Sequence, residues 1–278
     1  MPFFWRKHMF PFFILFGKVI STYMLASLVG IFASGVFACY YARKKYLDSI
    51  EMLIMLLIAA AGGLVGSHML YGIVNYRYIV ILTNNIDKIT SFKMLFNSLT
   101  EIFGGSVFYG GLIGGIIAGY IYAIKQGLDI YKYADIAAVS IPLMHTFGRI
   151  GCFLGGCCYG VESDIGYVYT CSLIEEANGV SRFPIQLLES SLNLILFFIL
   201  FYLLRKSFFS QRLIYLYLCI YSIMRFILEF WRGDNHRGFI FGISTSQFIS
   251  ILIFIASVYA YINKSVNMKK TKNISNEI

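Results

Sequence analysis

The chain has 278 residues, of which 58% are hydrophobic and only 13% are charged, and its formal net charge is +9. A soluble domain carries about 25% charged residues, so this composition excludes an ordinary soluble globular protein and places most of the surface in lipid. The basic residues form short tracts between long apolar runs, as in loops beside anionic headgroups. Because no basic face with interleaved aromatic residues appears, we expect no nucleic-acid partner.

Seven apolar runs are long enough to cross a bilayer as helices, which takes roughly 20 residues. We therefore predict an all-α, polytopic membrane protein with about seven transmembrane helices, in a single integral-membrane domain over residues 1–263. The predicted spans are Val19–Ala42, Met52–Tyr76, Ile102–Ile124, Ile136–Leu154, Ile185–Leu204, Leu213–Trp231 and Phe239–Asn263.

The loops predict an orientation. One set of alternate connections, with the C-terminal tail, holds twelve Lys and Arg residues, against nine on the opposite side. Cytoplasmic loops carry the excess, so we expect the N-terminus outside and the C-terminus in the cytoplasm. The connection over 155–184 is polar enough to form a small extracytoplasmic lobe. Residues 264–278 are rich in Asn, Lys and Ser and are expected to be a disordered cytoplasmic tail.

The third predicted span contains a glycine-rich run from Gly104 to Gly115. Glycines four residues apart, such as Gly110 and Gly114, allow two helices to pack closely in lipid. The earlier glycines favour a second interpretation, in which the helix breaks and its backbone lines a cavity. The two interpretations are compatible.

Arg149 lies near the end of the fourth predicted span, with apolar residues on both sides. An arginine within a span is costly and usually faces an interior cavity, and its guanidinium suits a phosphate. The alternative is a side chain that extends to the interface. His145 lies on the same helical face, four residues earlier. It is either a proton acceptor or, as we favour, a hydrogen-bonded structural histidine.

The sixth predicted span ends with Arg225, Glu229 and Arg232, spaced four and three residues apart. On a helix this spacing puts the three side chains on one face. A single carboxylate between two guanidinium groups leaves a positive surplus, which favours an anion site. The alternative is an internal ion pair that holds helices together.

Four of the six cysteines lie in one central stretch: Cys152, Cys157, Cys158 and Cys171. The spacing Cys-x4-Cys-Cys is not a common zinc pattern, and we predict no metal. A disulfide involving Cys171, or plain structural cysteines, is the favoured interpretation outside the membrane. A catalytic thiol is the second and a metal site the third.

Several motifs resemble the prolipoprotein diacylglyceryl transferase family, in the same order and over roughly residues 15–262. They are a Gly-Gly-Leu-Ile-Gly run, a Gly-Arg-x-Gly-x-Phe signature, a Pro-x-Gln-Leu-x-Glu element, a Glu-Phe-aromatic-Arg element and an early tyrosine. These motifs correspond here to Gly110–Gly114, Gly148–Phe153, Pro184–Glu189, Glu229–Arg232 and Tyr23.

The resemblance implies transfer of diacylglyceryl from phosphatidylglycerol to the thiol of a lipobox cysteine in a secreted precursor, in the bacterial plasma membrane. Glycerol phosphate is released, and neither a metal nor an organic cofactor is implied. Arg149 and Arg232 match the family's phosphate-handling arginines, and Glu229 is expected to orient one of them. Our candidate catalytic residues are Arg232, Tyr109, Glu229 and His145, with Tyr109 or His145 assisting proton transfer. Our candidate phospholipid-binding residues are Arg149, Tyr23, Gly110, Gly111, Gly151, Cys152 and Gly160.

The chain departs from the family pattern where protons are handled. Tyr109 stands where the family has His, Cys152 where it has Asn, Cys157 where it has a carboxylate, and Leu64 where it has Arg. A phenol with a pKa near 10 is a weak base at neutral pH. Two alternatives therefore stay open. One is a divergent paralogue that acts on another acceptor or binds lipid without turnover, and the other is a thiol-redox membrane protein.

Overall fold

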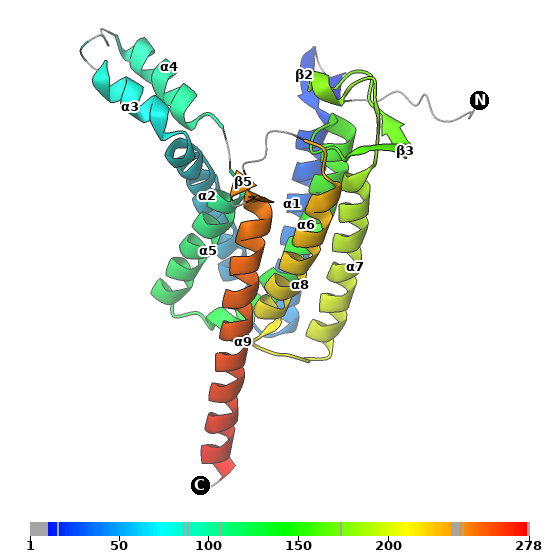
Figure 1. The fold of residues 1–278 in the computed structure, drawn as a ribbon. Helices are drawn as coiled ribbons and strands as arrows, with labels where there is room; N and C mark the ends of the chain where they lie inside the picture. Colours follow the sequence, from blue (N-terminus) through cyan, green and yellow to red (C-terminus); the bar gives the residue numbers. More distant parts are fainter. Residues whose placement is uncertain are drawn as a thin grey trace. The chain divides into compact units, whose positions relative to one another are not determined.

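The computed structural model describes residues 11–15, 17–85, 87, 89, 91–105, 107–172, 174–234, 239–240 and 242–276. Internal contacts divide the chain into two compact units, Met1–Ala38 with Ala134–Ile278 and Cys39–Tyr133. The described residues are predominantly helical, which confirms the predicted all-α class (Figure 1).

Among the described residues, six helices are long and apolar enough to cross a membrane, which confirms a polytopic membrane protein. The length and composition of these helices match six of the seven predicted spans. They are α1 (Thr22–Lys44), α2 (Ser49–Val74), α6 (Ile130–Gly155), α7 (Ile185–Arg205), α8 (Leu213–Leu228) with the η3 turn after it (Glu229–Trp231), and α9 (Thr245–Asn276).

The remaining predicted span, Ile102–Ile124, is not one helix. Instead, α4 (Phe92–Phe103) ends before Gly104 and Gly105, and α5 (Phe108–Lys125) begins after them. This confirms the interpretation that the early glycines interrupt the helix. The interruption leaves α5 with 18 residues. In the described part of the chain, α5 is not among the six candidate spans.

The break between α4 and α5 is held by α2. The Nδ1 atom of His68 lies 2.8 Å from the carbonyl oxygens of both Phe103 and Gly105, so it carries a proton and donates to them. The backbone N–H of Val107 donates to the carbonyl of Ser67 over 3.1 Å. Backbone groups that the helix no longer satisfies therefore find partners within the same unit.

Close glycine contacts join α2 and α5, which lie side by side (Figure 1). A Cβ atom placed on Gly110 would lie 2.3 Å from the carbonyl oxygen of Gly66, and one on Gly114 would lie 2.3 Å from that of Gly62. No side chain fits between backbones this close. The packing interpretation of the glycine run is therefore confirmed for Gly110 and Gly114.

We expect Gly66→Ala to destabilise the α2–α5 pair by about 1–3 kcal/mol, as overpacking does in a tight interface. Its added Cβ would lie 2.3 Å from the carbonyl oxygen of Gly110. Gly35→Ala is the matched control, since a Cβ there meets nothing within 4 Å. The measurement is the melting temperature of each variant in detergent, and equal values for both variants would contradict the packing account.

The long connection predicted between the second and third spans contains two short helices, α3 (Tyr76–Asn84) and α4. The hydroxyl of Ser91 accepts the N–H of Met94 and so caps the start of α4. Large apolar side chains such as Phe92 and Phe96 are exposed on α4. Span length alone does not reveal these helices, because both are shorter than a membrane crossing.

Two predicted helix starts are wrong by a few residues because short hairpins occupy them. β1 (Phe12–Leu15) pairs antiparallel with β2 (Lys18–Ser21), and β5 (Phe239–Ile240) pairs with β6 (Ile243–Ser244). Gly17 and Gly242 turn these hairpins at φ values of 73° and 82°, where glycine meets no steric penalty. Hydropathy alone does not separate a short apolar strand from the beginning of a helix.

At the C-terminal end, the sequence predicts a disordered tail from residue 264, whereas α9 continues to Asn276. This stretch contains neither Gly nor Pro, and lysine is a good helix former, so nothing in it terminates the helix. Along its earlier part α9 packs beside α8 (Figure 1).

Asp135 on α6 positions the start of α8. Its carboxylate accepts the backbone N–H of Leu213 over 2.9 Å and also the N–H of Gln211. These N–H groups have no partner within α8. The contact therefore sets where α8 begins relative to α6. It also sets the position along α6 of the charged residues at the other end of α8, Arg225 and Glu229.

The segment predicted as a lobe contains β3 (Glu162–Val168), η2 (Glu175–Ala177) and β4 (Ser181–Arg182), with β3 and β4 antiparallel. Its small core consists of Tyr159, Tyr169 and Ala177. The Arg182 guanidinium lies 4.3 Å from the ring centroid of Tyr159. Burial raises the pKa of both Tyr159 and Tyr169 above the usual value, so both phenols stay neutral.

Candidate functional site

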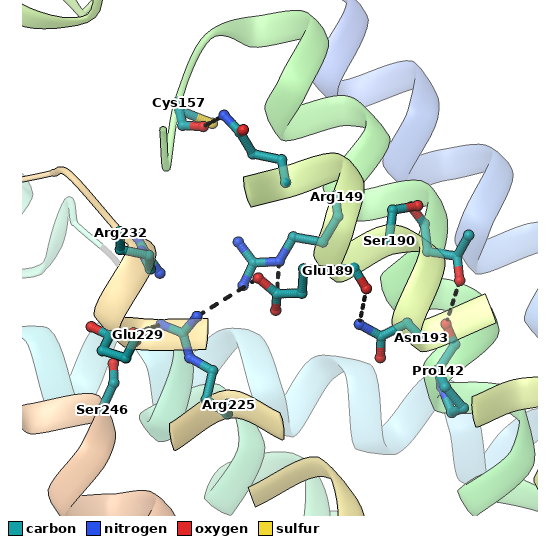
Figure 2. A network of polar contacts seen from close by, with 12 residues as sticks. Pro142, Arg149, Cys157, Glu189, Ser190, Asn193, Arg225, Glu229, Arg232 and Ser246 are labelled. Carbon is teal, nitrogen blue, oxygen red and sulfur yellow. Dashed lines mark hydrogen bonds and ion pairs between the residues drawn. The ribbon is translucent and has the colours of Figure 1, made fainter. Parts of the chain in front are cut away.

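A chain of ion pairs connects α6, α7 and α8 in the unit that contains all three helices (Figure 2). Arg149 Nε lies 3.0 Å from Glu189 Oε1, and Arg225 Nη1 lies 3.7 Å from Glu189 Oε2. Arg225 Nη2 then lies 2.7 Å from Glu229 Oε2. The second distance is an ion-pair separation too long for a hydrogen bond. Glu189 therefore bridges two guanidinium groups from different helices.

The two carboxylates in this series of ion pairs, those of Glu189 and Glu229, are almost fully buried, and each residue is 3% exposed. A buried charge is tolerated only when it is paired and hydrogen-bonded. The hydroxyl of Ser190 donates to the carbonyl of Thr146 over 2.9 Å, which fixes α7 on α6 beside Arg149. The geometry of the charged cluster is therefore set by helix packing and not by flexible side chains alone.

Arg232 lies beyond the helix that the sequence predicts for it. α8 ends at Leu228, and the η3 turn follows, so only Arg225 and Glu229 keep the helical spacing. Arg232 makes a two-pronged ion pair with Asp234, with Nε 2.9 Å from Oδ1 and Nη2 on Oδ2. The expectation of one carboxylate between two guanidinium groups on one helical face is therefore wrong at Arg232.

The expected positive surplus also needs correction. The surplus was expected from Arg225, Glu229 and Arg232, whereas the cluster also includes Glu189 (Figure 2) and Asp234, which pairs with Arg232. With Arg149 there are three arginines and three carboxylates, so the formal charges balance. Binding of an anion at this cluster therefore depends on which guanidinium nitrogens are not already paired with a carboxylate.

Arg149 has nitrogens available for a further anion. Its Nε meets Glu189, and within the described ranges its two terminal nitrogens have no ion-pair or hydrogen-bond partner. The side chain is 19% exposed, so a ligand can reach it. A guanidinium held on one edge by a carboxylate presents its other edge in fixed orientation, which is the geometry for binding a phosphate oxygen pair.

The backbone of the lobe fixes Arg232. Gly160 forms an antiparallel bridge with Arg232, and the N–H of Gly233 donates to the carbonyl of Tyr159 over 3.0 Å. A Cβ on Gly160 would lie 2.3 Å from the carbonyl oxygen of Phe183. Only glycine fits this position. Gly160 therefore holds Arg232 at the end of α8 through the backbone.

Gly151 allows α1 to approach α6 two residues beyond Arg149. A Cβ there would lie 3.1 Å from both the carbonyl oxygen of Tyr23 and the Cβ of Ala26. A Cβ on Gly155 would likewise lie 3.6 Å from the Cβ of Tyr23, so Tyr23 packs along the end of α6 that carries Cys152. Tyr23, Gly151 and Cys152 therefore form one neighbourhood next to Arg149.

Three of the four central cysteines also gather here. The sulfur atoms of Cys152, Cys157 and Cys158 all lie within 4.8 Å of one another. Cys171 is exposed in the lobe, and no disulfide joins cysteines in the described part of the chain. Of the two parts of the favoured expectation, the disulfide with Cys171 does not match this structure, whereas plain structural cysteines do.

The candidate proton-handling residues lie in different units. His145 lies on α6 one turn before Arg149, with its ring centroid 5.4 Å from that of Tyr221. Tyr109 is 8% exposed and begins α5 in the other unit, together with Gly110 and Gly111. The structure therefore brings His145 to the arginine cluster. Tyr109 belongs to the unit Cys39–Tyr133, which does not contain that cluster.

Glu189 belongs to the Pro-x-Gln-Leu-x-Glu element, but the sequence assigned it no role in the site. It is the single charged residue in the predicted span Ile185–Leu204, and an ionisable group at such a position indicates a functional site. That signal was present in the sequence. The sequence does not indicate which residues pair with Glu189, because Arg149 and Arg225 are each about forty residues away along the chain, one on either side.

The family model described as prolipoprotein diacylglyceryl transferase matches residues 11–263. A phosphatidylglycerol–prolipoprotein diacylglyceryl transferase of Clostridium tetani is 36% identical over 89% of this chain and 94% of its own length. An enzyme of that name numbered 2, from Clostridium perfringens, is 30% identical over 92% and 96%. One from Campylobacter jejuni is 31% identical over 90% and 91%.

These matches cover the arginine cluster, the cysteine cluster and both units of the described structure. They also agree with the order of motifs from Tyr23 to Arg232. The chain therefore belongs to the prolipoprotein diacylglyceryl transferase family.

Proposed function

We propose that this protein is a phosphatidylglycerol–prolipoprotein diacylglyceryl transferase of the bacterial plasma membrane. It moves diacylglyceryl from phosphatidylglycerol to the lipobox cysteine thiol of a secreted precursor and releases glycerol phosphate. The relatives carry this name over nearly the full chain. The observation that carries the proposal is the fixed guanidinium of Arg149, with one edge on Glu189 and the other available in a partly exposed position.

The bond that breaks joins a glyceryl carbon to a phosphate oxygen, so negative charge grows on the phosphate as the thiol sulfur attacks. Cations placed on that phosphate lower the barrier. We assign this role to Arg149 and to Arg232, whose pairing with Asp234 orients it. Glu229 acts by fixing Arg225, which shares Glu189 with Arg149. Glu229 is therefore a positioning residue and not a group that touches the substrate.

The thiol must lose a proton before or during attack. His145 and Tyr109 remain our two candidates for assisting it. His145 lies beside the arginine cluster, while Tyr109 stands at the family's histidine position. Tyr23, Gly151, Cys152 and Gly160 are proposed to line the phospholipid site with Arg149. Gly110 and Gly111 belong to the family's Gly-Gly-Leu-Ile-Gly run and remain proposed phospholipid-binding residues on that ground.

We propose one membrane domain over residues 1–263, supported by the continuous family match to 11–263. The orientation follows from the loops: the connection after α1 carries Arg43, Lys44 and Lys45, and this basic cluster favours the cytoplasmic side. The N-terminus is then outside and the C-terminus is in the cytoplasm. This topology puts the lobe and the arginine cluster on the outer side, where secreted precursors emerge.

The test is a lipidation assay with purified protein, phosphatidylglycerol in mixed micelles and a lipobox peptide. We expect a peptide that gains a diacylglyceryl thioether, detected by mass spectrometry. A folded sample that binds phosphatidylglycerol without forming product would favour the lipid-binding paralogue. A thiol-redox protein predicts instead no thioether product, together with a function that Cys157→Ser impairs more than Arg232→Ala does.

If Tyr109 takes part in proton transfer, Tyr109→Phe lowers the initial rate of the same reaction by roughly 10²-fold, the lower end of general acid–base effects. Tyr120→Phe is the matched control, since Tyr120 lies on the same helix and is 53% exposed. An unchanged rate for Tyr109→Phe would remove Tyr109 from the mechanism and leave His145 as the candidate.

A further inference from the structure

We propose that Cys152, Cys157 and Cys158 form a three-thiolate site for Zn²⁺ with an open fourth position that binds the substrate thiol. The three sulfurs already lie within 4.8 Å of one another beside Arg149. The role given to the fourth position rests on the transferase function proposed above. The site itself does not depend on that function.

The end of α6 brings the first two sulfurs together. The N–H of Cys157 donates to the carbonyl of Cys152 over 3.1 Å, and the N–H of Gly156 donates to that of Phe153 over 3.3 Å. Gly156 has a φ of 72°. This is the Schellman ending of a helix, in which the side chains at the positions of Cys152 and Cys157 normally touch. The contact is therefore built into the helix terminus.

The third sulfur is brought in by an unusual backbone conformation. Cys158 has a φ of 53°, in the left-handed region that residues other than glycine, Asn and Asp seldom adopt. Such strain persists only where the surroundings impose it. Here Gln186, which is 1% exposed, donates to the carbonyl of Cys157 over 2.8 Å, and Ser172 donates to that of Gly156 over 3.1 Å. Two hydrogen bonds from separate segments thus hold the turn (Figure 2 shows that to Cys157).

The spacing suits zinc. A tetrahedral zinc ion lies about 2.3 Å from each thiolate sulfur, which places the sulfurs about 3.8 Å apart. The observed sulfurs need to approach by at most about 1 Å, within the reach of small changes in side-chain rotamer. Three protein ligands with a fourth position left open is the arrangement of zinc sites that act on a substrate. Cys157 and Cys158 are only partly buried, so that position is accessible.

The charges nearby also fit. Three thiolates with one Zn²⁺ carry a net charge of −1, because binding releases the three thiol protons to solvent. Arg149 acts electrostatically on Cys152 and Cys158, and Arg232 acts on Cys158. An anionic zinc complex is therefore stabilised by cations that the phosphate site already requires.

The zinc site would supply the thiol activation that the positions altered from the family pattern, Tyr109, Cys152 and Cys157, no longer provide. The acceptor thiol binds zinc as a thiolate, and its proton passes to water. A sulfur lone pair then attacks the glyceryl carbon, the carbon–oxygen bond breaks, and its electron pair leaves with glycerol phosphate held by the arginines. The neutral thioether is a weak ligand and leaves the zinc. No electron transfer and no further reactant are needed.

The experiment uses the full chain, purified under reducing, oxygen-free conditions, stripped with a chelator and titrated with Co²⁺ as a spectroscopic substitute for Zn²⁺. We expect a thiolate-to-cobalt charge-transfer band at one ion per chain, abolished by added Zn²⁺. Cys152→Ser and Cys157→Ser should each weaken binding by at least about tenfold through loss of a thiolate ligand. Cys171→Ser and Cys219→Ser are the controls and should retain the band.

Absence of the band from folded protein with all thiols reduced, or a band that survives Cys157→Ser, would overturn the site. The lipidation assay separates the two proposals. Metal binding without any transfer would overturn the proposed transferase and leave the three-thiolate site supported. Transfer by stripped protein at a rate unchanged by Zn²⁺ would overturn the role in thiol activation while the transferase stands.

Discussion

Replacement of Arg149 by alanine is expected to lower diacylglyceryl transfer by about 10²–10³-fold, the effect of removing one preorganised group from a developing anion. The protein should still insert and fold, because Glu189 keeps Arg225 as a partner at 3.7 Å. The loss should appear mainly in kcat, since charge on the phosphate is greatest in the transition state.

Two further variants sharpen this prediction. Arg149→Lys should recover only part of the rate, because an ammonium group restores the charge but not the planar fork that meets Glu189 and the phosphate together. Arg205→Ala is the control, since Arg205 is an exposed arginine at the end of α7. A rate for Arg149→Ala equal to that of Arg205→Ala would show that the phosphate is bound elsewhere.

Replacement of Glu189 by glutamine is expected to destabilise the protein by about 3–5 kcal/mol, the cost of breaking a buried ion pair by removing one partner. Glu189 is the carboxylate shared by Arg149 and Arg225, and it is 3% exposed. Without it, the guanidinium groups of Arg149 and Arg225 no longer share a carboxylate in this buried setting. Glu229 remains paired with Arg225.

The free energy of unfolding in mixed micelles measures this effect. Glu175→Gln, on the exposed surface of the lobe, is the control and should stay within about 0.5 kcal/mol of the parent protein. A double variant that also replaces Arg149 by methionine should recover part of the loss, because Arg149 forms its ion pair with Glu189 and is the cation left unpaired, whereas Arg225 keeps Glu229. If Glu189→Gln were as stable as the control, the bridging role of this carboxylate would be disproved.

The membrane class and most of the spans could be predicted from the sequence because hydropathy and length alone determine which helices enter a bilayer. Arg149 could be found for the same reason, since a charge within an apolar run stands out. The break at Gly104 was also predictable from glycine chemistry. These signals are local, and each depends on residues that are close together in the chain.

The pairing within the cluster depended on contacts between distant segments. Glu189 was visible as an isolated charge, but its position between Arg149 and Arg225 is set by how α6, α7 and α8 pack. The sequence predicts that Arg232 shares a helix with Arg225 and Glu229, whereas α8 ends at Leu228. The meeting of Cys152 with Cys157 follows from a helix ending that required the conformation of Gly156, which the sequence alone did not define.

The central claim is that Arg149 and Arg232 together bind the phosphate of the lipid headgroup. The most direct measurement is the affinity of the purified protein for glycerol phosphate, the released product, by calorimetry in neutral detergent. We predict binding by the parent protein and by Arg205→Ala, and at least about tenfold weaker binding by Arg149→Ala and by Arg232→Ala. Equal affinity in all four proteins would contradict the claim and place the phosphate site away from this cluster.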